Sequence, residues 1–214
     1  MQKTKEKLYI KVPSSIVRNE DFTITADEYL LYSRLCFWYF RLYQNKEIKM
    51  DVNKLKKFLK ISDNRTLKAK LNNLYKHNLI ENKIESLPRK KEIIIVFNDE
   101  LYNSFKQFTF ISADLFDLYK EEKINCDGFR LIMYYKSHIN RKTGNNYCFV
   151  GYATLATRLK ISNSTIQEAN NKLLKEKLLK IEINKLEPTY EYNEQDEIIF
   201  TKYNNHYYVA ESLH

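Results

Sequence analysis

The sequence predicts a mainly helical α+β protein with small β-hairpins, built as two tandem units from an internal duplication. Three observations support this prediction. The tetrapeptide LKIS occurs at Leu59–Ser62 and again at Leu159–Ser162. Apolar residues recur at helical spacing after both Asp27 and Asp127. With three residues each among 214, glycine and proline are too scarce for a loop-rich all-β protein.

The similarity between the two units extends on both sides of LKIS. Upstream, the run YIKVPSSIV from Tyr9 aligns with FTFISADLF from Phe108. The offset is about 100 up to LKIS and 99 after it, which places a one-residue insertion or deletion in the turn. Matches spread this widely indicate a duplicated unit. The boundary falls near residues 98–107, giving domains of 1–103 and 104–214.

The first unit is expected to hold three helices. After an extended segment over 9–17, Thr25 caps a long helix that runs to about Tyr43. A short helix covers about 52–59. Ser62 is the expected cap of a third helix that runs to His77, and Asn78 follows in a left-handed conformation.

Two strands are expected to follow the third helix in each unit. In the first unit they cover 79–85 and 92–98, with a hairpin tip between them. In the second unit the third helix covers about 163–177, and the strands LLKIEINKL and EIIFTKY are joined by the longer segment EPTYEYNEQD.

This order of elements resembles the winged helix-turn-helix family. The matching pattern is an apolar residue and a serine, then a threonine and an apolar residue, then apolar residues late in the third helix and after it. In the first unit these are Ile61, Ser62, Arg65, Thr66, Leu67, Leu74, Leu79 and Ile80. In the second they are Ile161, Ser162, Thr165, Ile166, Leu173, Leu178 and Leu179. The resemblance implies a third helix in the DNA major groove and a wing against the flanking backbone or minor groove.

The third helix of the first unit carries no acid on its outward face. With Leu67, Leu71 and Leu74 facing inward, that face presents donors and amides suited to guanine, adenine and phosphate. A solvated amphipathic helix is the alternative interpretation. The residues expected to contact DNA in and around this helix are Ser62, Asn64, Arg65, Thr66, Lys68, Asn72, Asn73 and Lys76.

Positive charge is concentrated in the first unit. Residues 1–103 hold 21 Lys and Arg against 13 Asp and Glu, whereas residues 104–214 hold 15 against 14. This excess favours a polyanionic partner, although a lysine-rich soluble surface is the alternative. The expected wing tip adds three consecutive cations, which either contact DNA or protect an exposed strand edge: Arg89, Lys90 and Lys91.

The second unit is less clearly a DNA-binding unit. Its third helix carries Glu168 on the outward face, and its hairpin holds five acids, Glu187, Glu191, Glu194, Asp196 and Glu197. The basic loop 140–147 partly compensates. The sequence favours DNA contact by both units, with protein docking by the second left open. The residues expected to contact DNA here are Arg141, Lys142, Ser164, Thr165, Gln167, Asn171, Lys172 and Lys175.

No pattern typical of an enzyme, a cofactor site or a membrane protein is found in the sequence. The four histidines are isolated, no glycine-rich phosphate loop occurs, and the 17 tyrosines lack a surrounding catalytic constellation. The three cysteines lie far apart, and neither a signal peptide nor a membrane span is evident. We therefore expect a cytoplasmic protein that is not an enzyme, binds no cofactor or metal, and has double-stranded DNA as its partner.

The N-terminal region resembles one group of plasmid replication initiators from Gram-positive bacteria, which consist of two winged-helix units. The matching residues are Lys11, Val12, Pro13, Ala26, Leu30, Leu31 and Tyr32. The resemblance implies binding of repeated origin sequences, DNA opening and recruitment of host replication proteins.

Two alternatives stay open. A transcriptional regulator of a phage or mobile element would bind a palindromic promoter site as a homodimer, whereas an initiator would bind direct repeats as monomers. A protein-interaction adaptor would use the winged folds without salt-sensitive DNA affinity.

Overall fold

The computed structural model describes residues 7–88, 92–183, 188–192, 198–200 and 205–214. The first half contains β1 (Tyr9–Pro13), α1 (Ser14–Arg18), α2 (Ala26–Arg41), β2 (Glu47–Asp51), α3 (Val52–Leu59), α4 (Asn64–Lys76), β3 (Glu92–Val96) and α5 (Asp99–Ser104). The second half contains β4 (Phe108–Ser112), α6 (Asp114–Lys120), α7 (Cys126–Ser137), the 3-10 turn η1 (Arg141–Thr143), β5 (Cys148–Phe149), α8 (Tyr152–Leu159), α9 (Asn163–Lys175), β6 (Leu179–Ile183), β7 (Pro188–Tyr192), β8 (Ile198–Phe200), β9 (Asn205–Val209) and η2 (Glu211–Leu213). The mixed α+β class predicted from the sequence is confirmed.

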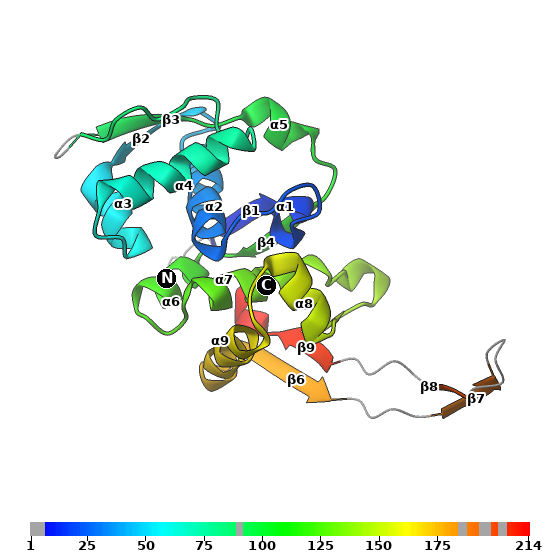
Figure 1. The fold of residues 1–214 in the computed structure, drawn as a ribbon. Helices are drawn as coiled ribbons and strands as arrows, with labels where there is room; N and C mark the ends of the chain where they lie inside the picture. The colour runs from blue at the N-terminus through cyan, green and yellow to red at the C-terminus, as the bar shows by residue number, and fades with distance from the viewer. Residues whose placement is uncertain (1–6, 89–91, 184–187, 193–197, 201–204) are drawn as a thin grey trace, which may run out of the picture.

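The strands form small antiparallel sheets within the described part of the chain. β2 pairs with β3, the second half holds a sheet of order β5-β9-β6, and β7 pairs with β8. The remaining pair joins the two halves, because β1 of the first half pairs with β4 of the second. Figure 1 shows β1 and β4 between the part of the molecule that carries α4 and the part that carries α9. None of the described helices is both long and apolar enough to cross a membrane.

Local capping signals predicted several helix ends correctly. Thr25 caps α2 in a capping box, in which its hydroxyl accepts from the Glu28 amide and its own amide donates to the Glu28 carboxylate. The predicted short helix matches α3 from Val52 to Leu59. Asn78 has a φ of 55°, as expected of a left-handed residue beyond a helix.

The expected cap of the third helix was wrong by one residue. Asp63 caps α4, and its carboxylate accepts from the Thr66 amide at 2.7 Å and from the Thr66 hydroxyl at 2.7 Å. A carboxylate at this position also interacts favourably with the positive helix N-terminus, which explains why Asp63 rather than Ser62 takes the role.

The expected extended segment over 9–17 ends early. The strand stops at Pro13, and Ser14–Arg18 form helix α1 instead. Proline lacks the amide that would continue a ladder, and the Ser14 hydroxyl is bonded to Thr109 at 2.9 Å in the interior. One helical turn then buries both Ile16 and Val17, which a strand would place on opposite faces. The same change from strand to helix occurs where α6 follows β4.

Residues 79–85 do not form the predicted strand. They make a single bridge, Ile80 to Phe97, and the Glu81 amide donates to the Val96 carbonyl at 2.7 Å. Beyond that point the Asn82 side chain replaces the ladder, donating to the Ile94 carbonyl and accepting from the Val96 amide at 2.9 and 2.8 Å. An asparagine amide imitates a peptide group, so backbone pairing is not needed there.

The predicted strand pairing of the second unit was also wrong. β6, inside the predicted strand LLKIEINKL, pairs with β9 at Asn205–Val209 and not with the EIIF segment. β8 lies in that segment and pairs with β7, which falls within the expected connection. The alternation in NHYYV, with Tyr207 and Val209 buried, was the overlooked strand signal.

A continuous hydrophobic core joins the two halves. Tyr29 of α2 lies 6.3 Å from Phe129 of α7 between ring centroids, and Phe129 stacks on Phe116 of α6 at 5.4 Å. Phe116 in turn meets Phe37 of α2 edge to face at 5.6 Å. The halves therefore share buried aromatic surface instead of packing as separate bodies.

Arg130 of α7 provides a polar link between the halves within this core. Only 1% of the residue is exposed. Its guanidinium donates to the Ile24 carbonyl at 2.5 Å and to Asn19 Oδ1 at 2.5 Å, and lies 4.8 Å from the Tyr29 ring centroid. Burial lowers the pKa of Arg130 to about 10. A cation on the second half thus fixes the loop between α1 and α2 of the first.

Candidate nucleic-acid interface

Helix α4 is held by an apolar face and one ion pair. Leu67, Leu71 and Leu74 are fully buried, as the sequence predicts. Lys70 Nζ lies 2.8 Å from Asp27 Oδ2 of α2. Burial raises the pKa of Asp27, but hydrogen bonds from Cys126 and Lys70 outweigh burial and leave this pKa lowered. The opposite side of α4 is therefore presented in a fixed orientation.

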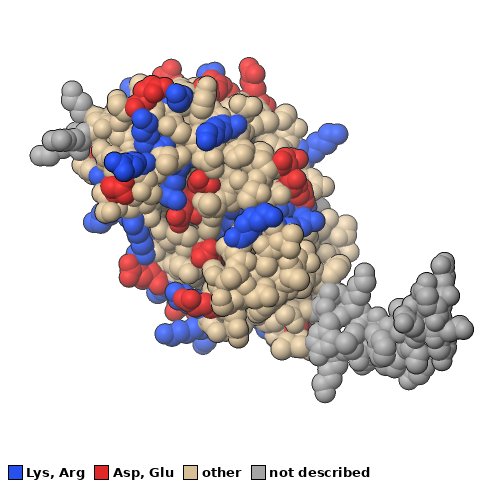
Figure 2. All heavy atoms as spheres, viewed as in Figure 1, with Lys and Arg blue, Asp and Glu red and all other residues tan. Residues whose placement is uncertain are grey.

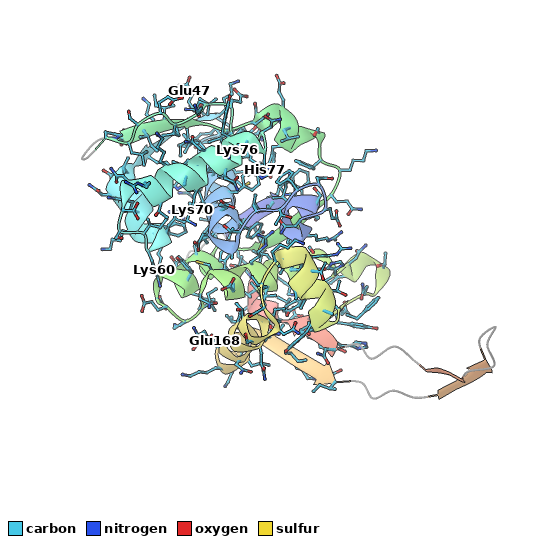
Figure 3. The ribbon with its side chains drawn as sticks, viewed as in Figure 1. Glu47, Lys60, Lys70, Lys76, His77 and Glu168 are labelled. Atoms are coloured by element: carbon cyan, nitrogen blue, oxygen red, sulfur yellow. The ribbon has the colours of Figure 1, made fainter. Side chains whose placement is uncertain are left out.

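The outward side of α4 carries exposed cations. Arg65 and Lys76 are exposed, whereas Lys68 and Asn73 are half-buried. Figure 3 shows Lys70 and Lys76 along α4 and Glu168 on α9. Arg65 and Lys76 can reach a ligand without any rearrangement of the core.

Asn72 does not lie free on this face, contrary to the expectation that it reads a base. Its side chain accepts from the Ile84 amide at 3.0 Å and donates to the Ile84 carbonyl at 3.2 Å. The amide is thereby occupied in tying α4 to the segment that leads into the hairpin. Position on a helix face could not reveal this, because the partner is a backbone group 12 residues away.

The N-terminal turn of α4 is organised by Asp63. Hydrogen bonds from Thr66, of which the backbone bond is the strongest, lower the pKa of Asp63. Thr66 is exposed but its hydroxyl is engaged, and Ser62 is exposed beside it. Asn64 is half-buried, and its Oδ1 has no hydrogen-bond partner within the described part of the chain.

The expected wing tip lies outside the described residues. Arg89, Lys90 and Lys91 all fall there, and the description resumes at Glu92, where β3 begins. On the near side, Ile84 is buried and Leu87 packs against the core. The base of the expected wing is therefore fixed to the first half.

Helix α3 contributes lysines that the sequence interpretation did not assign to the interface. Lys54 and Lys57 are exposed on α3. Lys60 follows in the left-handed conformation that ends the helix and pairs with Glu122 of the second half at 3.0 Å. The run KLKKFLK was the available signal for a second basic helix beside α4.

Helix α9 of the second half has a weaker charge pattern. Ser164, Gln167, Asn171 and Lys175 are exposed and Thr165 is half-buried. Thr165 and Ser164 are within hydrogen-bond distance of the Ser162 hydroxyl, which caps the helix. Lys172 Nζ lies 3.2 Å from Glu168 one turn earlier, so each charge is offset by the other.

The basic loop of the second half is also partly neutralised. Arg141 pairs with Glu211 at 2.5 Å. The side chain of Lys142 lies outside the described part of the structure. Figure 2 shows Lys and Arg interspersed with Asp and Glu on the face that it presents. Charge density alone therefore does not mark a single patch on this face.

Nowhere in the described ranges do three or more His, Cys, Asp or Glu side chains gather in a way that could hold a metal ion. The sequence matches no protein-family model and no curated protein.

Proposed function

We propose that the chain binds double-stranded DNA sequence-specifically, with each half acting as a winged helix-turn-helix and α4 as the main reading helix. The exposed side of α4 carries this proposal: Arg65 and Lys76 project from a helix of 13 residues whose apolar face is fixed in the core. A helix of this length, roughly 20 Å, can lie along the major groove. A cytoplasmic location and a lack of catalytic activity are parts of the same proposal.

The order of elements supports the winged-helix assignment. In the first half it runs α2, β2, α3, α4 and β3, with β2 paired to β3. In the second half the strand order β5-β9-β6 places the last strand between the strand before α8 and the strand after α9. The turn between α3 and α4 and the turn between α8 and α9 each begin with a left-handed lysine, Lys60 and Lys160.

The pairing of β1 with β4 supports a two-fold relation between the halves. In the sequence alignment Tyr9 corresponds to Phe108 and Pro13 to Ser112. In the ladder, Tyr9 pairs with Ser112 and Pro13 with Phe108, so corresponding residues exchange places. A two-fold relation would present α4 and α9 to half-sites of opposite orientation.

The first experiment identifies the site and then tests Arg65. Oligonucleotides selected from a random duplex pool supply the target, and binding is measured for the Arg65→Ala variant. The variant should lose about 1–3 kcal/mol and relax preference at one base pair. Arg41→Ala, another exposed arginine of the first half, is the matched control and should bind normally. Equal loss on every sequence would reduce Arg65 to a phosphate contact.

Salt dependence separates this proposal from a protein-interaction adaptor. Binding that displaces counterions gives a steep negative slope of log affinity against log salt. Duplex affinity that does not change with salt concentration, or that is undetectable even at low salt, would favour the adaptor. A Lys175→Glu variant tests the second half separately, since an unchanged duplex affinity would assign α9 to protein docking.

Replication initiation is the use of DNA binding that we propose on the basis of the sequence resemblance. Its alternative is a transcriptional regulator. An initiator would occupy direct repeats with one chain on each, and each repeat would contain two half-sites of opposite orientation. A regulator would occupy one palindrome as a homodimer. Footprinting together with the mass of the complex distinguishes the two stoichiometries.

A further inference from the structure

The outer face of the β1–β4 ladder exposes aromatic rings. Residues alternate along each strand, so Ile10 and Ile111 are buried while Tyr9 and Phe110 point outward. Tyr9 is 43% exposed and Phe110 is 49% exposed. In the register Phe110 lies opposite Lys11, two positions from Tyr9, which makes Tyr9 and Phe110 diagonal neighbours on one surface.

A hollow of about 820 Å³, here called the ladder groove, runs along this face. It is bounded by Tyr9, by residues 106–110 and by residues 136–141 at the end of α7. Lys11 Nζ lies 4.2 Å from the centroid of Phe108 and covers that ring. Lys11 Nζ also lies 5.7 Å from the Phe110 centroid, and Lys7 Nζ lies 5.9 Å from the Tyr9 centroid. Tyr9 and Phe110 are nevertheless the exposed rings of this ladder.

The ladder groove is lined by four lysines and arginines and by no Asp or Glu side chain of the described residues. Arg18, Lys106, Lys136 and Arg141 all contribute to its walls. Arg18 donates to the Ser137 hydroxyl at 3.0 Å, which fixes its position beside the groove. Two acids lie outside the lining, Glu20 at 3.3 Å from Arg18 and Glu211 at 2.5 Å from Arg141. They offset part of the charge, and Glu211 also acts on Lys136, whose amine is hydrogen-bonded to the His214 ring. Neither Lys106 nor Lys136 forms a salt bridge with an acid among the residues that the structure describes.

Burial and neighbouring cations together lower the pKa of two groups in the groove lining. Burial, followed by the nearby Arg141, lowers the pKa of Lys136 to about 8. Burial also lowers the pKa of His138 to about 4, with Arg18 and Arg158 contributing. Cations that disfavour one another in this way would be stabilised by a bound anion.

A second hollow, lined by residues of both halves, is the counterpart used for comparison. Arg34, Arg41 and Lys120 line it together with Asp114 and Asp117. Both signs of charge are present there. The absence of acids therefore distinguishes the ladder groove from its counterpart among the described residues.

We propose that the ladder groove binds single-stranded nucleic acid, with unpaired bases stacked on Tyr9 and Phe110 and phosphates near Lys106 and Lys136. Exposed rings beside a cationic groove are the combination that holds single strands, because each base has a face to stack and each linkage a negative charge. Duplex DNA would not use the rings, since its bases are already stacked and paired. None of the outward residues of α4 lines this groove, so the site is separate from the α4 face proposed above to read the duplex, although Arg141 of the expected basic loop borders it.

The test measures fluorescence anisotropy of a labelled 15-mer oligodeoxythymidylate with the full chain. Phe110→Ala should weaken binding roughly 5- to 100-fold, because it removes one stacking surface from an exposed position. Phe149→Ala is the matched control, since Phe149 is 59% exposed on β5 and away from the groove. Lys106→Ala should weaken binding and reduce its salt dependence, whereas Lys180→Ala, an exposed lysine of β6, should not. An oligouridylate of equal length shows whether DNA or RNA is preferred.

Three results would overturn the proposal. Phe110→Ala could bind the single strand as well as Phe149→Ala does. Phe110→Ala could weaken duplex binding equally, which would make the groove part of the duplex interface. The chain could instead form a dimer that Phe110→Ala dissociates, which would identify the face as a self-interface. Failure here is distinguishable from failure of the duplex proposal, because Arg65→Ala should leave single-strand affinity unchanged.

Discussion

Asn72 links the candidate reading helix to the segment that leads into the hairpin, and we expect the Asn72→Ala variant to unfold more easily. The Asn72 amide makes two hydrogen bonds with the backbone of Ile84, at 3.0 and 3.2 Å. Ile84 is 5% exposed, so its peptide group has little access to water once the side chain is removed. The variant therefore loses two hydrogen bonds and leaves the amide and the carbonyl of Ile84 without these partners.

The size of the effect follows from these two bonds. Each neutral hydrogen bond contributes about 1 kcal/mol to the free energy of unfolding, so their loss costs about 2 kcal/mol. Alanine is a better helix former than asparagine, which returns roughly 0.5 kcal/mol. Asn73→Ala gains the same helix propensity, and Asn73 makes no side-chain hydrogen bond that the described structure contains. The two variants should therefore differ by about 2 kcal/mol.

Urea unfolding followed by the fluorescence of Trp38, the single tryptophan, measures this difference. Amide exchange at Ile84 gives a local readout, and we expect faster exchange in Asn72→Ala than in Asn73→Ala. Duplex affinity should fall by a similar factor on all sequences, because the change acts through the position of the hairpin. Equal stability of the two variants, with equal protection at Ile84, would refute the structural role. A loss confined to one base pair would restore Asn72 as a reading residue.

Two further predictions concern the core and the acid response. Arg130→Ala should lower the free energy of unfolding by about 3–5 kcal/mol, because it opens a cavity and leaves the Ile24 carbonyl without its closest hydrogen-bond donor. An unchanged midpoint of urea unfolding would contradict this. Burial lowers the pKa of His138 from 6.5 to about 4, so between these values the unfolded chain binds more protons and stability falls as pH falls. After allowance for its partial exposure, the loss between pH 7 and 4 should be about 1–2 kcal/mol. His138→Phe should reduce the slope of the free energy of unfolding against pH. Some slope should remain, because burial also lowers the pKa of His214 to about 4. An unchanged slope would exclude His138 as a cause of the acid destabilisation.

Local signals in the sequence determined most of the helices. Thr25 and the acid three residues after it fix the start of α2, and the spacing of Leu67, Leu71 and Leu74 fixes the buried side of α4. Such signals act within one or two helical turns, so neighbouring residues are enough to reveal them. The exposure of Arg65 follows from the same spacing.

The sheets were predicted less well because their partners are distant in sequence. Alternation indicates a strand, but it does not say which strand it pairs with. The run YIKVP was correctly predicted as extended, yet its partner β4 lies about 100 residues away in the other half. Residues 79–85 have strand-like composition, and the Asn82 side chain satisfies the neighbouring strand in place of their backbone.

The sequence by itself determined the mixed α+β class and the buried side of the candidate reading helix, and it predicts two similar modules. Only the tertiary structure decided that the halves share one core, that Asn72 bonds to the hairpin segment, and that Tyr9 and Phe110 are diagonal neighbours beside several cations. The physical reason is the separation in sequence over which each kind of interaction acts. Caps and helical periodicity depend on residues a few positions apart, whereas hydrogen-bond partners, ion pairs and shared surfaces join residues that only folding brings together.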